Sequence, residues 1–141
     1  MRCAYSWRMN NAERTEAAIT RWHDVVNGKD ATGGRWAVAD TIVVNGPKGA
    51  GPISAGDFAD WIVRPGVEMR ARSYHPITER VMVVEQDARW PQSPQWTRVA
   101  TVFRATGDRV SAALRFPELR SALEFARLYT ELAATELAGT E

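Results

Sequence analysis

The segment from residue 68 to residue 116 constrains the fold most, because it divides into four stretches typical of β-strands. β-branched and aromatic residues recur within each stretch, and Pro, Gly, Ser or Asp mark the breaks, as expected for successive strands. The predicted strands span Glu68–Pro76, Glu79–Trp90, Gln95–Ala105 and Arg109–Phe116. Strands joined by such short turns pair antiparallel. The sequence therefore predicts an antiparallel meander.

An amphipathic helix is predicted upstream, over Asn11–Val26, where apolar residues recur at three- and four-residue spacing. Asn10 and Glu13 form a capping-box pattern at its start, and Asn27-Gly28 supplies a left-handed stop at its end. Both ends of this helix are thus marked in the sequence.

The stretch between the first helix and the meander is less regular. Residues 29–40 are compatible with a short helix or a strand, because Gly33-Gly34 argues against one continuous helix. Residues 41–45 are predicted as a strand and residues 46–52 as a turn-rich loop. Ser54 and Asp57 open a second helix, which ends at Pro65-Gly66.

A long helix is predicted after the meander, starting behind Pro117 and reaching about Leu137. Helices on one side of a curved antiparallel sheet make an α+β fold. We therefore expect a cone-shaped sheet wrapped around the N-terminal helices, with an additional C-terminal helix. Residues 1–10 are predicted to be a flexible tail, residues 11–117 the cone domain, and residues 118–141 the last helix and a short tail of the same domain.

The composition argues against two classes of binding partner. The 141 residues fit one domain, and 18 basic residues nearly balance 17 acidic ones with the signs interspersed. This pattern predicts neither nucleic-acid nor membrane binding. The single cysteine, Cys3, and the lack of a secretory signal in residues 1–11 predict a cytoplasmic protein, which starts at Met1 or at Met9.

The order of elements resembles the ketosteroid-isomerase and SnoaL-like branch of the nuclear-transport-factor-2-like superfamily. The resemblance covers residues 12–117 and rests on the block Arg21-Trp-His-Asp-Val-Val-Asn-Gly-Lys-Asp30, on Val44-Asn-Gly-Pro-Lys-Gly49, and on the Gly107-Asp-Arg-Val110 turn. It implies the cone-shaped fold, an enclosed pocket and, in SnoaL-like proteins, cyclisation, isomerisation or hydration without a cofactor.

The isomerase's catalytic groups are not retained at the matching positions. Trp22 stands where the family has a tyrosine, Gly46 where it has the base carboxylate, and Thr101 where it has a carboxylic acid. In that isomerase, a carboxylate moves the proton while a tyrosine and a protonated carboxylic acid bind the oxyanion. Gly46 cannot act as the base, and Trp22 cannot take the place of the tyrosine. Thr101 is expected to donate a weaker hydrogen bond than the carboxylic acid does. Steroid isomerisation by this mechanism is therefore disfavoured.

Of the two histidines, His75 is the better candidate for proton transfer, since an unperturbed imidazole titrates near neutrality. A hydrogen-bonded structural histidine is the alternative, and His23 is expected to be exposed. The predicted ligand-binding residues are Trp22, Trp61, Tyr74, Glu85, Arg98, Thr101 and Arg115. Each has a structural alternative: the tryptophans as core residues, and Glu85 and Arg98 as cross-strand ion pairs. With the family's strand parity, Thr101, Ser111, Ala113 and Arg115 would face inward.

Two functional hypotheses follow. The first is a pocket for a small apolar or polycyclic molecule, with cofactor-independent cyclase, isomerase or hydratase activity in which His75 carries the proton. The second is a non-catalytic ligand-binding or protein-interaction module. The spacing of His, Cys, Asp and Glu predicts no metal site, and the segment Gly46–Gly51 lacks the spacing of a phosphate-binding loop. A homodimer is expected in either case.

Overall fold

The computed structural model describes residues 10–46, 49–64 and 66–139, with the backbone alone for residues 137–139. The predicted tail lies outside these residues except for Asn10. Cys3 and the two candidate start residues, Met1 and Met9, lie outside them as well. Asn10 caps helix α2 (Asn11–Gly28): its side chain accepts from the Glu13 amide at 2.8 Å, and the Glu13 carboxylate accepts from the Asn10 amide at 3.0 Å. The predicted capping box is confirmed. The left-handed residue that ends the helix is Lys29, with φ 52°, rather than Gly28.

The irregular region resolves into a short helix and a hairpin. Helix α3 (Ala31–Ala37) begins at the Asp30 cap, and strand β1 (Val38–Gly46) pairs antiparallel with β2 (Gly49–Ser54). The loop predicted for residues 46–52 is therefore wrong, because Gly49–Pro52 belong to β2. Gly34 lets α3 approach helix α4 (Ala55–Val63), since a Cβ there would lie 2.8 Å from Ile62 Cδ1.

The predicted meander is confirmed. It consists of β3 (Glu68–Pro76), β4 (Val81–Trp90), β5 (Ser93–Thr106) and β6 (Arg109–Phe116), each antiparallel to the next. The six-stranded sheet has the order β2-β1-β6-β5-β4-β3, and β1 joins β6 in parallel. The N-terminal hairpin thus extends the meander at its β6 edge.

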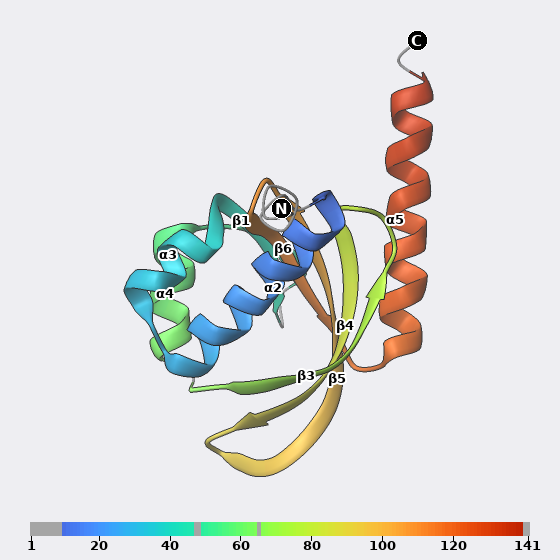
Figure 1. The fold of residues 1–141 in the computed structure, drawn as a ribbon. Coiled ribbons are helices and arrows are strands. Elements are labelled where there is room, and N and C mark those ends of the chain that lie inside the picture. The colour runs from blue at the N-terminus through green and yellow to red at the C-terminus, as the bar shows by residue number, and fades with distance from the viewer. Residues whose placement is uncertain (1–9, 47–48, 65, 140–141) are drawn as a thin grey trace, which may run out of the picture.

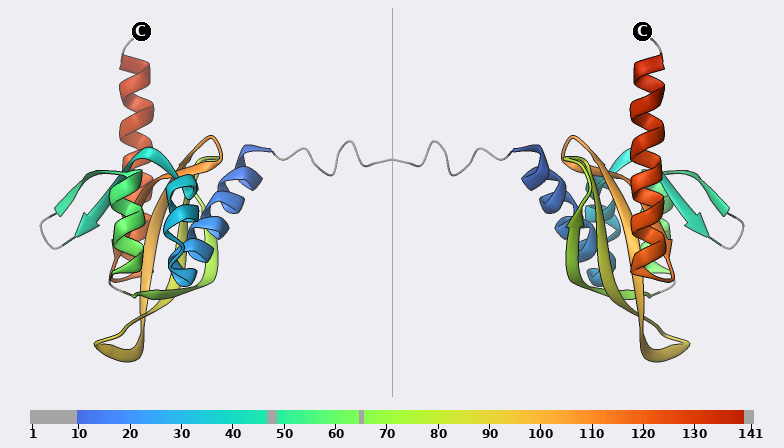
Figure 2. Two further views of the ribbon diagram at one scale, coloured as in Figure 1. Left: turned by 90° about the vertical axis from the view of Figure 1, so that its left-hand side faces the viewer. Right: turned by 90° about the vertical axis from the view of Figure 1, so that its right-hand side faces the viewer.

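The curved sheet separates two layers of helices (Figure 1). Helices α2, α3 and α4 lie on the inner face, whereas α5 (Leu119–Gly139) packs across the opposite face against β4, β5 and β6 (Figure 2). The expectation of helices on one side is therefore wrong for α5. The outer face needs a cover because it carries its own apolar cluster, here named the outer core: Val81, Val83, Ala100, Val102, Ala122 and Ala126.

The inner core lies between α2, α4 and the concave face of the sheet. Its largest buried side chains include Phe58, Phe103, Ile19, Ile42 and Ile62. Alternation assigns the strand residues to the two faces, since successive side chains point to opposite sides of a sheet. Val84 and Phe103, for example, belong to the inner core, and their neighbours Val83 and Val102 belong to the outer core.

Candidate functional site

A pocket of about 710 Å³ opens between α2, α4, the β1–β2 hairpin and the inner face of β5 and β6. Its buried wall consists of Trp22, Phe58, Met69, Thr101 and Ala113. Polar side chains lie at its exposed mouth: Asn45, Asp57, Arg64 and Arg115. The hairpin forms one side of the mouth and projects from the body beside α4 (Figure 2). The arrangement is an apolar interior with a polar rim, as is usual for small-molecule sites.

Trp22 lines this pocket and carries a buried hydrogen-bond donor. Its indole is only 4% exposed and packs edge-on against Phe103, with ring centroids 4.9 Å apart. The Nε1–H group has no acceptor among the described residues. A buried unpaired donor costs about 1–3 kcal/mol, so such a group calls for an explanation.

Behind Thr101, a chain of hydrogen bonds crosses the inner core to α2. The Thr101 hydroxyl donates to Gln86 Oε1 at 2.6 Å, Gln86 Nε2 lies 2.8 Å from His23 Nε2, and His23 Nδ1 lies 2.9 Å from the Ile19 carbonyl oxygen. Thr101, Gln86 and His23 are 2%, 0% and 6% exposed. His23 is therefore buried, and its expected exposure is wrong, because it shares the inner face of α2 with Ile19 four residues earlier.

The donor and acceptor of each hydrogen bond in this series follow from the Ile19 carbonyl at its end. The Ile19 carbonyl can only accept, so His23 Nδ1 carries the proton and His23 Nε2 accepts from the Gln86 amide. Gln86 Oε1 then faces Thr101 and accepts the hydrogen bond from its hydroxyl group. Thr101 thus retains only lone pairs for a ligand, which corrects the expectation that it donates.

Burial lowers the pKa of His23, because the charged imidazolium would lose its hydration in the inner core. The hydrogen bond to the Ile19 carbonyl and the nearby Asp24 carboxylate act in the opposite direction and are smaller effects. His23 is therefore neutral at pH 7, in agreement with the accepting role of its Nε2 atom.

Arg115 supplies a cation at the mouth. The Arg115 guanidinium lies over the Trp90 ring, 5.1 Å from the centroid. Although the residue as a whole is exposed, the crowding of its guanidinium by neighbouring groups partly desolvates it and lowers its pKa. The group stays protonated at neutral pH because an arginine pKa lies far above 7. Asn45 holds this part of β6 in place, since its side chain bonds both the amide and the carbonyl of Arg115 at 2.9 and 2.8 Å.

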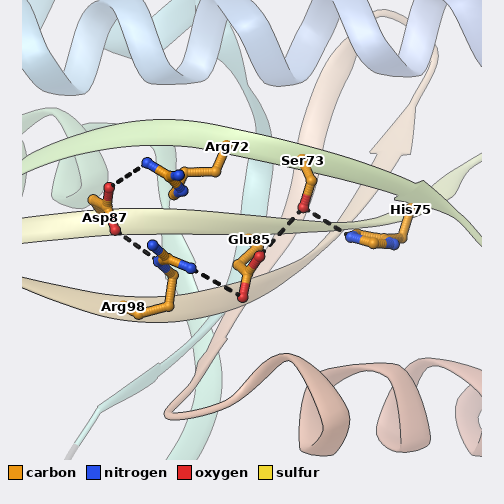
Figure 3. Close-up of polar contacts among 6 residues, drawn as sticks. All are labelled: Arg72, Ser73, His75, Glu85, Asp87 and Arg98. Carbon is orange, nitrogen blue, oxygen red and sulfur yellow. Dashed lines mark hydrogen bonds and ion pairs between the residues drawn. The ribbon is translucent and has the colours of Figure 1, made fainter.

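Four of the eight predicted site residues meet in this pocket: Trp22, Trp61, Thr101 and Arg115. Tyr74 lies on the inner face and packs against the inner core, outside the pocket wall. The other three, His75, Glu85 and Arg98, pair in register with strand residues of the outer face or lie beside them, away from the pocket (Figure 3).

On the outer face these three residues belong to a network of hydrogen bonds and ion pairs (Figure 3). Ser73 Oγ lies 2.9 Å from His75 Nε2 and 3.4 Å from Glu85 Oε1. Arg98 lies 3.6 Å from Glu85 and 2.7 Å from Asp87. The hydrogen bond from Arg98, and a second one from Arg72, lower the pKa of Asp87. The structural alternative of cross-strand pairing thus accounts for Glu85 and Arg98.

One further sequence expectation, an inward-facing Ser111, is wrong. Ser111 bonds Arg104 at 3.0 Å, and Arg104 in turn bonds Tyr129 of α5, so Ser111 belongs to the outer side of the sheet. A register shift between Arg104 and Ala105 changes the alternation that the parity argument assumed. Thr101, Ala113 and Arg115 line the pocket as parity predicts.

The sequence reasoning missed Gln86 and His23. Gln86 lies between two charged residues, Glu85 and Asp87, yet it shares a strand face with Val84 and Ala88, which are apolar. The same period-two alternation that predicted β4 could have marked it as inward-facing. The spacing of His23 from Ile19 was the corresponding signal on α2.

No protein-family model and no curated protein matches the sequence. Solved structures do match. An NTF2-like protein of unknown function from Cytophaga hutchinsonii superposes with a TM-score of 0.64 at 7% identity, over 77% of this chain and 94% of that one. The chain has the NTF2-like fold.

Two other structures with this fold show how varied its uses are. A candidate ketosteroid isomerase from Kribbella flavida matches with a TM-score of 0.64 at 14% identity, over 79% of this chain and 83% of that one. A computationally designed binder of 17-OHP matches with a TM-score of 0.63 at 15% identity, over 76% and 92%. Cyclase-like and epoxide-hydrolase-like proteins also share the NTF2-like fold. At identities this low, structural similarity establishes the fold, and the function has to be argued from the residues of the site.

The three positions at which the resemblance places the isomerase's catalytic groups, Trp22, Gly46 and Thr101, all line the same pocket. Asp57, at the mouth, is the only carboxylate residue among the described lining residues. Across residues 10–46, 49–64 and 66–139, no cluster of three His, Cys, Asp or Glu side chains is placed to hold a metal ion. None of the helices described is long and apolar enough to cross a membrane.

Proposed function

We propose that this NTF2-like protein binds a small, largely apolar molecule in the pocket between α2, α4 and the β1–β2 hairpin. The observation that carries the proposal is the separation of chemistry within the pocket: its buried wall is mostly apolar and aromatic, and its charged groups lie at the mouth. A flat or polycyclic body fits against Trp22, Phe58 and Trp61. Arg64 and Arg115 would interact with a polar group left at the entrance.

Binding is favoured over acid–base catalysis. The buried wall offers Trp22 and Thr101 as its hydrogen-bonding side chains, and neither ionises in the range that proton transfer at neutral pH requires. His75 lies on the outer face, so the proton-carrier role expected for it is not part of this proposal. Cyclisation, isomerisation or hydration would require the ligand's own reactivity, with the pocket holding its conformation.

The first test is native mass spectrometry of the purified protein, followed by denaturing extraction and identification of any retained molecule. A bound polycyclic or other apolar metabolite would support the proposal and nominate the substrate class. Titration with pyrene, followed by its fluorescence, tests the same pocket when nothing is retained.

Two glycine variants give a matched control. A Cβ added at Gly46 or at Gly28 meets no atom of the described residues within 4 Å, and of the two glycines Gly46 alone lines the pocket. We expect Gly46→Trp to weaken pyrene binding about tenfold or more, a loss of about 1.4 kcal/mol, because the indole occupies the mouth. Gly28→Trp should bind as the unmodified chain does. Equal affinities for both variants would place the binding site elsewhere.

A further inference from the structure

Arg115 links the buried wall of the pocket to its mouth. Its Cα is the register partner of Thr101 on β5, and Thr101 is 2% exposed. The Arg115 side chain lines the pocket, yet the residue as a whole is exposed. Its aliphatic stem therefore covers apolar surface while the charged end stays near water, as is usual for long basic side chains.

The Arg115 guanidinium is held in place but has no anionic partner. It lies over the Trp90 ring, 5.1 Å from the centroid, and Asn45 binds the Arg115 amide and carbonyl at 2.9 and 2.8 Å. A ring offers the N–H donors no oxygen acceptor. Among the described residues, the hydrogen bonds of Arg115 involve its backbone alone, and no carboxylate forms an ion pair with it. An anion is the partner that this cation lacks.

The other charged groups at the mouth also favour an anion. Arg64 is a second exposed cation that lines the pocket, and it pairs with no carboxylate of the described residues. Asp57 lies in the first turn of α4, where the helix amides already stabilise its negative charge, at the opposite end of that helix from Arg64. Of the two arginines, Arg115 is the one held by an aromatic ring and by a side chain that fixes its backbone.

We propose that the pocket selects apolar molecules that end in a carboxylate, and that Arg115 binds this carboxylate at the mouth while the apolar body lies inside. The inference rests on the proposed function and adds the chemical class of the ligand. A planar, singly charged carboxylate matches one guanidinium, which can donate to both oxygens at once. The partial loss of water around Arg115 strengthens the pair, because charges interact more strongly where the local dielectric is lower.

The test compares three pyrenes that carry the same butyl chain with different ends: pyrenebutanoate, pyrenebutanamide and pyrenebutylammonium. At pH 7.5 these are an anion, a neutral molecule and a cation. A pocket without a cation would bind the amide best, since a charged end loses more hydration on entry. We expect the butanoate to bind about three- to tenfold tighter than the amide, and the ammonium compound to bind weakest. About 0.5 M NaCl should reduce the preference, because salt screens exposed charges.

Four variants assign the preference for butanoate over amide to Arg115. Arg115→Gln removes the charge at similar length and should abolish the preference. Trp90→Leu removes the ring under the guanidinium and should reduce it, with the affinity for the amide unchanged. Arg64→Gln should retain most of it. Arg120→Gln is the matched control, because it changes the net charge equally from an exposed position on α5, across the sheet from the pocket, and should retain all of it.

The outcomes separate this inference from the proposed function. Failure of pyrene and all three derivatives to bind would overturn both. Binding of pyrene, with the amide or the ammonium compound as tight as the butanoate, would overturn the carboxylate selection and leave an apolar binding site. This comparison uses the unmodified protein, so it stands even if a variant fails to fold. A preference that persists in Arg115→Gln, or that Arg120→Gln also abolishes, would overturn the role assigned to Arg115.

Discussion

His23 illustrates how one buried residue links the core to the binding site. Its imidazole is held neutral by burial, donates to the Ile19 carbonyl through Nδ1 and accepts from Gln86 through Nε2. Protonation of His23 would turn Nε2 into a donor and oppose the Gln86 amide. The neutral state of His23 therefore stabilises both the fold and the accepting role of Thr101.

The lowered pKa of His23 predicts acid sensitivity. Below the unfolded-state pKa of about 6.5, the unfolded chain binds a proton on His23 that the folded chain does not, so the free energy of unfolding falls as pH falls. The slope is at most about 1.4 kcal/mol per pH unit. Above that pKa the contribution is constant. Urea unfolding between pH 7.5 and pH 5 would measure it.

Between pH 7.5 and pH 5, the two carboxylates with lowered pKa values do not contribute to this change in the free energy of unfolding. Glu68 and Asp87 have lowered pKa values from their arginine partners, so the stability they provide is present above the ordinary carboxylate pKa of about 4 and is lost only below it. A free energy of unfolding that stays flat from pH 7.5 to pH 5 would contradict the buried neutral state of His23.

At the scale of elements, two asparagine side chains bond to the backbone of a strand, one from a helix and one from the neighbouring strand. Asn27, at the end of α2, bonds both the amide and the carbonyl of Met69 in β3, each at 2.8 Å. Asn45, at the end of β1, makes the equivalent pair of bonds to Arg115 in β6. Strand β3 is an edge strand of the sheet, so Asn27 satisfies backbone groups that have no neighbouring strand.

The two asparagines form a matched pair for mutation. Asn27→Ala should lower the free energy of unfolding by about 2 kcal/mol, because it leaves two partly buried backbone groups of Met69 unpaired. Asn45→Ala should cost less than about 1 kcal/mol, since water can reach the exposed groups it frees. Urea unfolding of both variants measures the difference. Equal costs would show that burial does not decide the strength of these contacts.

The elements differ in how well local sequence predicted them. Strands β3 to β6 followed from alternation and turn residues, and α2 and α4 from their caps, because these signals depend on neighbouring residues. Strand β2 was missed because Gly49-Ala-Gly-Pro52 has a turn composition. Its pairing with β1 over six register positions overrides that local preference.

At the scale of the whole molecule, α5 has two parts with different roles. Its first half covers the outer core through Ala122 and Ala126. Residues 131–136 are all exposed, and the helix continues beyond the sheet (Figure 1). Leu132, on this projecting part, is 61% exposed, and Leu128, one turn earlier, is 58% exposed. The fold therefore requires the first half of α5 much more than the second.

Truncation tests this division. A variant that ends at Thr130 keeps every α5 residue of the outer core and should unfold within about 1 kcal/mol of the full chain. A variant that ends at Pro117 exposes Val81, Val83 and Val102 and should aggregate or fail to fold. Thermal unfolding measures both. A large loss in the variant ending at Thr130 would show that the projecting half contributes to the core.

The homodimer expected from the sequence remains a prediction. Size-exclusion chromatography of the full chain and of the variant ending at Thr130 would test it. A dimer present only in the full chain would assign the contact to the projecting half of α5, and a monomer in both at micromolar concentration would contradict the prediction.

The sequence by itself determined the helix caps, the four strands of the meander and the α+β class. It also matched Trp22, Gly46 and Thr101 to the positions of the isomerase's catalytic groups. The tertiary structure alone decided that α5 covers the outer face, that β1 joins β6 in parallel, and that His75 lies away from the pocket. It also decided the hydrogen-bond direction at Thr101, which depends on a contact between His23 and Gln86, 63 residues apart. Local patterns record what neighbouring residues favour, whereas the face, partner and polarity of a side chain depend on segments that meet only when the chain folds.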